Sequence, residues 1–159
     1  EPYRRQRQMC IRDRTNNKGF SLVELIIVIA IMAILIGVLA PQYIKYVEKS
    51  RVSADKDLLD SVYNACTTAA SDPDLTGVPT TSGTQTVSGT AGDGTWGGEV
   101  LSTLGVSQWT QVNSKLKSKI AKSTNSIVVE TDAQGNFTVY VGSKNNTSAG
   151  ITVGAGANN

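Results

Sequence analysis

At 159 residues the chain has room for about one domain. It contains no histidine, which excludes a Ser-His-Asp arrangement and any histidine-based metal site. The net charge of +2 is unevenly distributed, because residues 1–19 hold six Lys/Arg and two acids while residues 20–159 hold nine Lys/Arg and eleven acids. The basic isoelectric point is therefore a property of the N-terminus, and we do not interpret it as a nucleic-acid-binding signal.

The N-terminal residues are treated as a leader rather than as part of a fold. The chain begins with Glu1, and Met9 offers an alternative start for a leader of eleven residues. Residues 1–14 are left out of the fold interpretation, and whether they are native stays open. The two cysteines are Cys10 and Cys66, so removal of the leader would leave one thiol and no intramolecular disulfide. We expect Cys66 to be a small apolar residue on a helix face.

An apolar segment follows the leader directly. It begins at Phe20, immediately after Lys18 and Gly19, and its part from Leu25 to Ala40 carries no charge. The 21 residues from Phe20 to Ala40 would span about 31 Å as a helix, which matches a hydrocarbon core of about 30 Å. The segment shows no polar face, so we interpret it as a membrane helix rather than a buried core helix. The basic residues before it would keep the N-terminal side in the cytoplasm.

The junction also carries a specific motif. The string GFSLVELIIVIAIMAILIGVLAP resembles the leader junction of type IV prepilins and the related pseudopilins. In that family a membrane-bound peptidase cuts after the glycine and methylates the new N-terminus, and the mature chain packs into a helical filament. The resemblance therefore implies cleavage between Gly19 and Phe20, N-methylation of Phe20, and loss of residues 1–19. It is dense over residues 18 to about 50 and only architectural beyond about residue 72.

Two other interpretations of the apolar segment stay open at this point. A secretory signal would be cut after Ala40, but Pro41 would follow the cut and the run is longer than the usual signal core. The second is an uncleaved single-pass anchor. Glu24 separates these interpretations, because a carboxylate in an apolar segment costs about 2.5–3.5 kcal/mol at mid-bilayer and less near an end. A plain anchor gains nothing from such a residue.

Glu24 gains a role once the chain is cut before Phe20. Cleavage would create an α-ammonium group, with a reference pKa of about 7.7–8.0, four residues from Glu24. In the filament that the resemblance implies, Glu24 of one subunit could meet the Phe20 ammonium of a neighbour. Such a pair works as a register device rather than as net stabilisation. The simpler alternative is that Glu24 only favours the positive N-terminal end of the helix at the membrane surface.

After Pro41 the pattern becomes amphipathic. One helical face is predicted from the apolar spacing of Val47, Ala54, Leu58, Val62, Ala65 and Ala69. The charged residues that interleave on the other faces are Glu48, Lys49, Arg51, Asp55, Lys56, Asp57 and Asp60. We expect one long helix over residues 20–71, with residues 20–40 as the membrane segment and filament core. It should end near Pro73, since the residue before a proline avoids the helical region.

Two residues should weaken this helix from within. Gly37 lowers helix stability by about 1 kcal/mol and Pro41 by about 3 kcal/mol or more. They predict either a simple kink where the chain leaves the bilayer or a segment that unwinds when the helix moves from membrane to filament.

Residues 72–159 are predicted to form a globular head. Residues 73–98 are rich in Thr, Gly and Ser and predict a long surface loop between helix and sheet. A short helix is expected over Glu99–Leu104. Gln111–Lys122 is expected to be either another helical stretch or a loop.

The strands are predicted near the C-terminus. The β-rich runs 126–131 and 136–141, joined by residues 132–135, predict a hairpin with Phe137, Val139 and Val141 on one face. Ile151–Val153 adds a further strand. The predicted fold class is α+β, with a three- or four-stranded antiparallel sheet packed on the amphipathic half of the long helix. The resemblance implies the same arrangement, the pilin fold.

Neither an enzyme activity nor a cofactor or metal site is predicted. No Gly-rich loop ends in Gly-Lys-Ser/Thr, so the chain is not expected to power its own assembly as an ATPase. After Asp132 the sequence has no carboxylate. That argues against the C-terminal calcium site typical of the major pseudopilin of type II secretion.

The resemblance implies a structural subunit, the major pilin of a type IV pilus, which polymerises through its N-terminal helix into a surface filament for adhesion, motility or DNA uptake. The implied partners are other pilin subunits, the prepilin peptidase, an inner-membrane assembly platform driven by a separate ATPase, and the membrane before assembly. The precursor would lie in the cytoplasmic (inner) membrane and the assembled subunit at the cell surface. The alternatives are a pseudopilin of a type II secretion or competence system and, in another class, a single-pass membrane-anchored surface binding domain.

Overall fold

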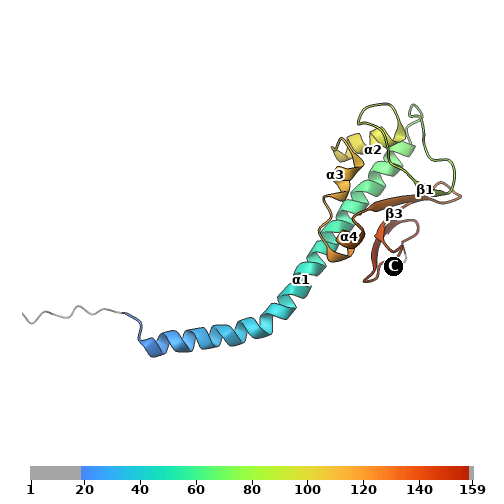
Figure 1. Cartoon of the computed structure of the whole chain (residues 1–159). Helices are drawn as coiled ribbons and strands as arrows, with labels where there is room; N and C mark the ends of the chain where they lie inside the picture. Colours follow the sequence, from blue (N-terminus) through green and yellow to red (C-terminus); the bar gives the residue numbers. More distant parts are fainter. Residues whose placement is uncertain (1–18, 158–159) are drawn as a thin grey trace, which may run out of the picture. The chain divides into compact units, whose positions relative to one another are not determined.

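The computed structural model describes residues 19–157, and the leader residues 1–18 lie outside that range. The chain divides into two compact units, Glu1–Ile44 and Lys45–Asn159. Helix α1, Leu22–Ala70, continues from the first unit into the second (Figure 1). The two units are therefore described in turn.

In the first unit the helix carries an unbroken apolar surface. The large apolar side chains from Phe20 to Ile44 are each half exposed or more. Within the described residues, α1 is the helix that is long and apolar enough to span a membrane, with a mean hydropathy of 3.1 over its most apolar window and none of that window buried. Because apolar area left in water costs roughly 25 cal/mol per Å², this surface requires a lipid or protein cover.

In the second unit the face that α1 turns to the core agrees with the sequence pattern in its last part and differs in its first part. The buried residues on this helix are Asp55, Leu59, Val62, Ala65, Cys66 and Ala69. The pattern correctly places Val62, Ala65 and Ala69 on this face, but Ala54 is exposed and Leu58 is only partly buried. Placing Asp55 on a polar outer face is wrong, because its carboxylate is buried against backbone N–H groups of the head.

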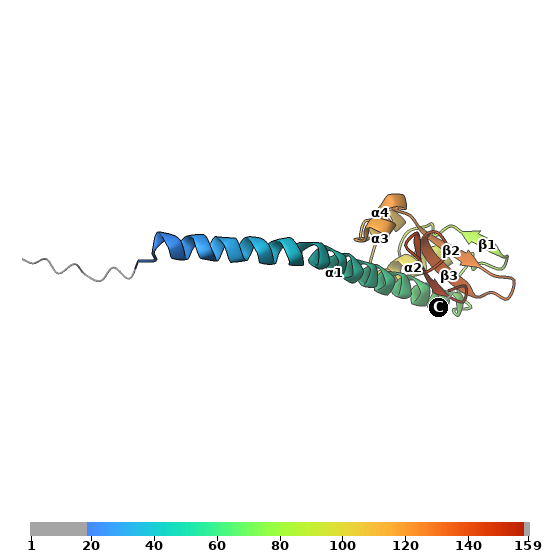
Figure 2. The ribbon, with the colours of Figure 1, turned by 90° about the horizontal axis from the view of Figure 1, so that it is seen from below.

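The sheet confirms the predicted α+β class. Within the described residues four strands pair antiparallel in chain order: β1 Gly83–Gln85, β2 Ile127–Thr131, β3 Phe137–Gly142 and β4 Gly150–Gly154. Strands β2 and β3 form the predicted hairpin, with Val129 opposite Val139. Phe137, Val139 and Val141 are buried, so one sheet face packs toward the core as expected. Figure 2 shows the ribbon of the sheet beside the last turns of α1.

Residues 73–98 are more structured than a surface loop. They contain β1, which pairs with β2, and the buried side chains of Val87 and Trp96. Helix α2 is Trp96–Leu104, so it begins three residues before the predicted start. The hydroxyl of Thr95 accepts a hydrogen bond from Gly98 N at 3.0 Å and so caps this helix.

A glycine explains how this segment packs. A Cβ atom on Gly97 would lie 2.0 Å from the backbone oxygen of Ser88. The chain around Ser88 can therefore lie against α2 because residue 97 has no side chain.

The two remaining helices are short, α3 Trp109–Asn113 and α4 Lys119–Thr124. The predicted helical stretch over Gln111–Lys122 is thus two helices separated by residues 114–118.

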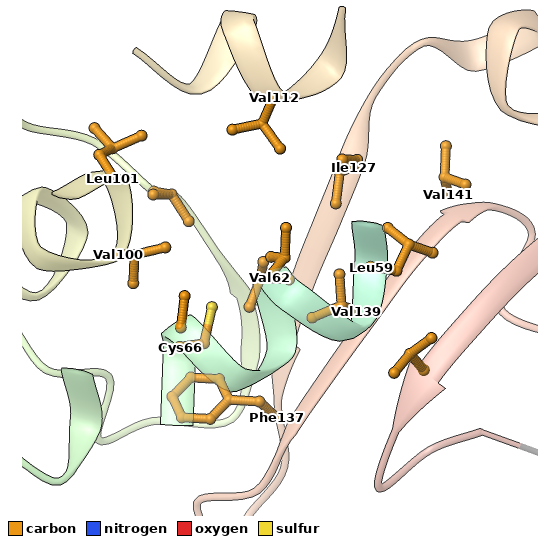
Figure 3. Close-up of a cluster of buried hydrophobic side chains, with 14 of the residues drawn as sticks. Leu59, Val62, Cys66, Val100, Leu101, Val112, Ile127, Phe137, Val139 and Val141 are labelled. Atoms are coloured by element: carbon orange, nitrogen blue, oxygen red, sulfur yellow. The ribbon is translucent and has the colours of Figure 1, made fainter. Parts of the chain in front are cut away.

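The core lies between α1, α2 and the sheet, as Figure 3 shows for ten labelled side chains. The ring of Trp96 stacks on Phe137 with 5.6 Å between the centroids, and its Nε1 donates to the carbonyl of Cys66 at 3.2 Å. Burial raises the pKa of the Cys66 thiol to about 12. Cys66 is therefore a protonated core residue, as the sequence predicts.

We expect a fragment of residues 45–159 to be a soluble monomer. Among the described residues, the large exposed apolar side chains all lie between Phe20 and Tyr46, and the core described above lies within the second unit. The fragment keeps its core and loses almost all of the exposed apolar surface. Sedimentation velocity should show a single monomeric species. Filaments formed by this fragment at micromolar concentration would show that the head itself drives assembly.

Candidate functional site

The predicted cleavage site lies in exposed, non-helical backbone. Gly19 and Phe20 precede the first turn of α1, and the Phe20 side chain is 80% exposed. Exposed backbone outside regular structure is where proteases act most readily. The geometry leaves the Gly19–Phe20 bond accessible, and cleavage there stays a prediction.

Glu24 has a partner within its own chain. Its Oε2 accepts a hydrogen bond from Ser21 N at 2.7 Å, while Ser21 Oγ accepts one from Val23 N at 3.2 Å. This Ser-x-x-Glu pattern is a capping box, in which two side chains satisfy N–H groups that the first helical turn leaves unpaired. The Ser-x-x-Glu pattern is present in the sequence, although only a general preference of Glu24 for the helix N-terminus is predicted from it. The carboxylate therefore has a local role in the single subunit, apart from any role in a filament.

Gly37 and Pro41 both lie inside α1. A Cβ atom added to Gly37 would meet no atom within 4 Å, so nothing within the subunit requires a glycine there. Residues on both sides of Pro41 are helical. Whether this stretch unwinds on assembly stays a prediction.

Two acidic residues of α1 hold the α3–α4 region, and the sequence analysis misses both roles. The carboxylate of Asp55 accepts hydrogen bonds from Lys117 N and Ser118 N, each at 2.8 Å. Oε1 of Glu48 accepts one from Lys119 N at 2.6 Å. Three consecutive N–H groups at the start of α4 are thereby satisfied by charged acceptors from α1.

The spacing of Asp55 contains a signal for this role. Asp55 lies four residues before Leu59 and seven before Val62, so it shares their helical stripe. Its partners, however, are more than sixty residues away in sequence and no local pattern names them.

Metal chemistry finds no support in the described part of the chain. Among residues 19–157 no group of three or more His, Cys, Asp or Glu side chains is placed to hold a metal ion.

The features that remain are an accessible N-terminal junction, a capped α1 helix whose first half is apolar and exposed, and a small α+β head. Together they fit a class of protein that is anchored in a membrane through one N-terminal helix.

Comparison with known proteins finds similarity over part of the chain. Residues 14–40 match the family described as "Prokaryotic N-terminal methylation motif". A curated relative, "Type IV major pilin protein PilA" of Myxococcus xanthus (strain DK1622), is 41% identical over 54 residues, which is 34% of this chain and 24% of that protein. The match thus spans about a quarter of the relative's length. No solved structure matches the chain.

These two similarities, both limited to part of the chain, support a type IV pilin, with pilins and pseudopilins taken together. The resemblance that the sequence analysis draws from the junction motif is confirmed. The family is one of structural subunits and not a known enzyme family.

Proposed function

We propose that this protein is the major subunit of a type IV pilus. The observation that carries the proposal is the methylation motif at residues 14–40, which overlaps the exposed apolar part of α1. The relative named as a major pilin supports this assignment over that of a pseudopilin. The work of the protein is polymerisation, and adhesion, motility or DNA uptake would be carried by the fibre.

Processing precedes assembly in this proposal. A prepilin peptidase removes residues 1–19 and methylates the nitrogen of Phe20. Until then, and until assembly, residues 20–40 lie in the inner membrane and residues 72–159 form the head outside it. The apolar surface of α1 is thus covered by lipid before assembly and by other subunits afterwards.

Assembly transfers α1 from lipid into a filament core. The partners are other copies of the subunit and an inner-membrane platform driven by a separate ATPase. The Glu24 carboxylate of one subunit pairs there with the Phe20 ammonium of a neighbour. Gly37 and Pro41 weaken the helix in the stretch that must adapt to the new surroundings.

Gly19→Val should block processing. A glycine offers no side chain to a tight scissile site, and a β-branched residue both adds bulk and restricts the backbone. The variant should accumulate in membranes as an unprocessed precursor, detected as the larger species by immunoblot and intact mass. Gly19→Ala serves as the matched control and should be processed more than Gly19→Val. Equal processing of Gly19→Val and the unchanged chain would contradict the assigned cleavage site.

Sheared surface fibres provide the test of the pilus assignment. Cells are vortexed, the released fibres are collected and their subunits are identified by mass. Abundant long fibres built mainly of this chain are expected. Short assemblies confined to the cell envelope would favour a secretion or competence pseudopilin, and monomeric protein that keeps residues 1–19 would favour a single-pass anchored domain.

A further inference from the structure

Charge in the head is sorted along the sequence. Residues 57–114 contain six Asp/Glu and no Lys/Arg, whereas residues 115–122 contain four lysines and no acid. Such segregation along the sequence allows surface regions of opposite charge to form in the folded head.

The structure places the lysine segment and the turn Ser71–Asp74 of the acidic segment at different levels of α1, whereas Asp57 and Asp60 lie on α1 near the lysine segment. The lysine segment is held to α1 through Glu48 and Asp55, while the acidic turn Ser71–Asp74 follows the end of α1 at Ala70. Asp55 and Ala70 are fifteen residues apart, which is about 22 Å along a helix. Figure 1 shows the same separation within the head, with α4 beside an earlier part of α1 and α2 beside its last turns.

The lysines surround a surface hollow of about 500 Å³. Its floor includes Ala54 and Leu58 of α1, and Lys115, Lys117 and Lys122 line it; we call it the lysine hollow. All three lysine side chains belong to exposed residues, and within residues 19–157 none of them forms an ion pair. Asp55 also lines the hollow, but its two oxygens are taken by backbone N–H groups. Three lysines against this one carboxylate leave the hollow with an excess of positive charge.

The acidic turn is a small, shaped projection of opposite charge. Asp72, Pro73 and Asp74 are exposed, and the Asp72 Oδ1 accepts a hydrogen bond from Asp74 N at 3.0 Å. Pro73 restricts the backbone between the two carboxylates. A second acidic loop lies beside this turn, because Thr76 N donates to the carbonyl of Gly94, next to Asp93, at 3.1 Å.

We propose that the lysine hollow of one copy of this chain receives the acidic turn of another copy. The inference rests on the proposed function, since it assumes that the chain polymerises. The contact joins two different surfaces, so each copy can bind one neighbour through its lysine hollow and another through its acidic turn. A heterologous contact of this kind repeats from copy to copy and generates a filament when it does not close into a ring. Opposite charges at the two surfaces fix the register and direction of stacking.

A second copy is favoured as the occupant because the complementary acidic turn is present on the same chain. Anionic lipid headgroups or nucleic acid could also bind lysines, but neither would involve Asp72 or Asp74. The experiment therefore reverses both surfaces, separately and together, in the full-length chain.

Lys115→Glu/Lys122→Glu is the first variant, and it spares the backbone N–H groups that bind Asp55. Asp72→Lys/Asp74→Lys is the second. Because like charges would then face each other at every contact, each variant alone should reduce the yield of sheared fibres by about tenfold or more. The amount of processed subunit in membranes should stay unchanged, and circular dichroism on residues 45–159 of each variant reports that the head still folds.

Rescue provides the matched control. Carrying all four substitutions on one chain restores opposite charges at the contact, so fibres should return. Co-expression of the two double variants should also restore fibres, and both variants should be found in them.

Normal fibres from either double variant alone would overturn the inference but leave the pilus assignment in place. Loss of fibres in the lysine variant without rescue would overturn it in favour of a lipid or nucleic-acid partner. A wild-type chain that forms no fibres would instead refute the proposed function.

Discussion

Glu24→Leu is expected to abolish fibre assembly while membrane insertion stays intact. A neutral residue inserts at least as well as a carboxylate, and the Gly19–Phe20 bond is unchanged, so processed subunit should accumulate in membranes. Assembly should fail because each added subunit would bury the Phe20 ammonium without a counter-charge, at a cost of several kcal/mol. The measurement compares processed protein in membranes with sheared fibres from the same cells.

Glu24→Gln separates the charge of this residue from its capping role. A glutamine can still accept the hydrogen bond that Ser21 N now donates to Glu24, so the capping box is retained while the charge is lost. We expect this variant to fail in assembly like Glu24→Leu. Normal fibres from Glu24→Gln but not from Glu24→Leu would show that helix capping, rather than ion pairing, is what assembly needs. Normal fibres from both would weaken the filament proposal as a whole.

Asp55→Asn is expected to destabilise the head by about 3 kcal/mol, because hydrogen bonds to a charged acceptor contribute about 1.5–3 kcal/mol each. The asparagine can keep one oxygen acceptor, but its amide group then faces the second N–H donor. The affected donors are Lys117 N and Ser118 N, and Ser118 is fully buried. For a head of this size the midpoint of thermal unfolding should fall by roughly 10 °C, measured by circular dichroism on residues 45–159.

Asp57→Asn is the matched control for that measurement. It makes the same chemical change two residues along the same helix, where the side chain is exposed. Surface substitutions of this kind change stability by about 0.5 kcal/mol or less. Equal unfolding midpoints for the two variants would show that the carboxylate of Asp55 does not hold the α3–α4 region in place.

The elements that the sequence predicts well are those with strong local periodicity. The hairpin of β2 and β3 follows from alternation and a turn containing Gly135, and the long helix follows from its apolar and amphipathic spacing. The three-residue strand β1 escapes prediction because its pairing with β2 is decided by residues more than forty positions away. The early start of α2 follows from the Thr95 cap, a local signal that the prediction misses, whereas the close approach of Ser88 to Gly97 is a tertiary feature.

The N-terminal junction and the Asp55 contact also differ in whether they depend on local or on distant residues. The N-terminal junction can be interpreted from the sequence because the proposed cleavage and membrane insertion both depend on residues within one short segment, and the family match covers that segment. Asp55 is misassigned because a charged residue on a helix is normally exposed, and the exception requires buried partners. Those partners come from residues 117 and 118, so the docking of the lysine segment becomes visible only in the folded head.

The intact mass and N-terminal sequence of the protein taken from cells test the central proposal most directly. The account predicts a mature chain that begins with Phe20, lacks residues 1–19 and carries one additional methyl group on its N-terminal nitrogen. A mature chain that begins at Pro41 would contradict it in favour of a secretory signal, and one that retains residues 1–19 would contradict it in favour of a plain membrane anchor.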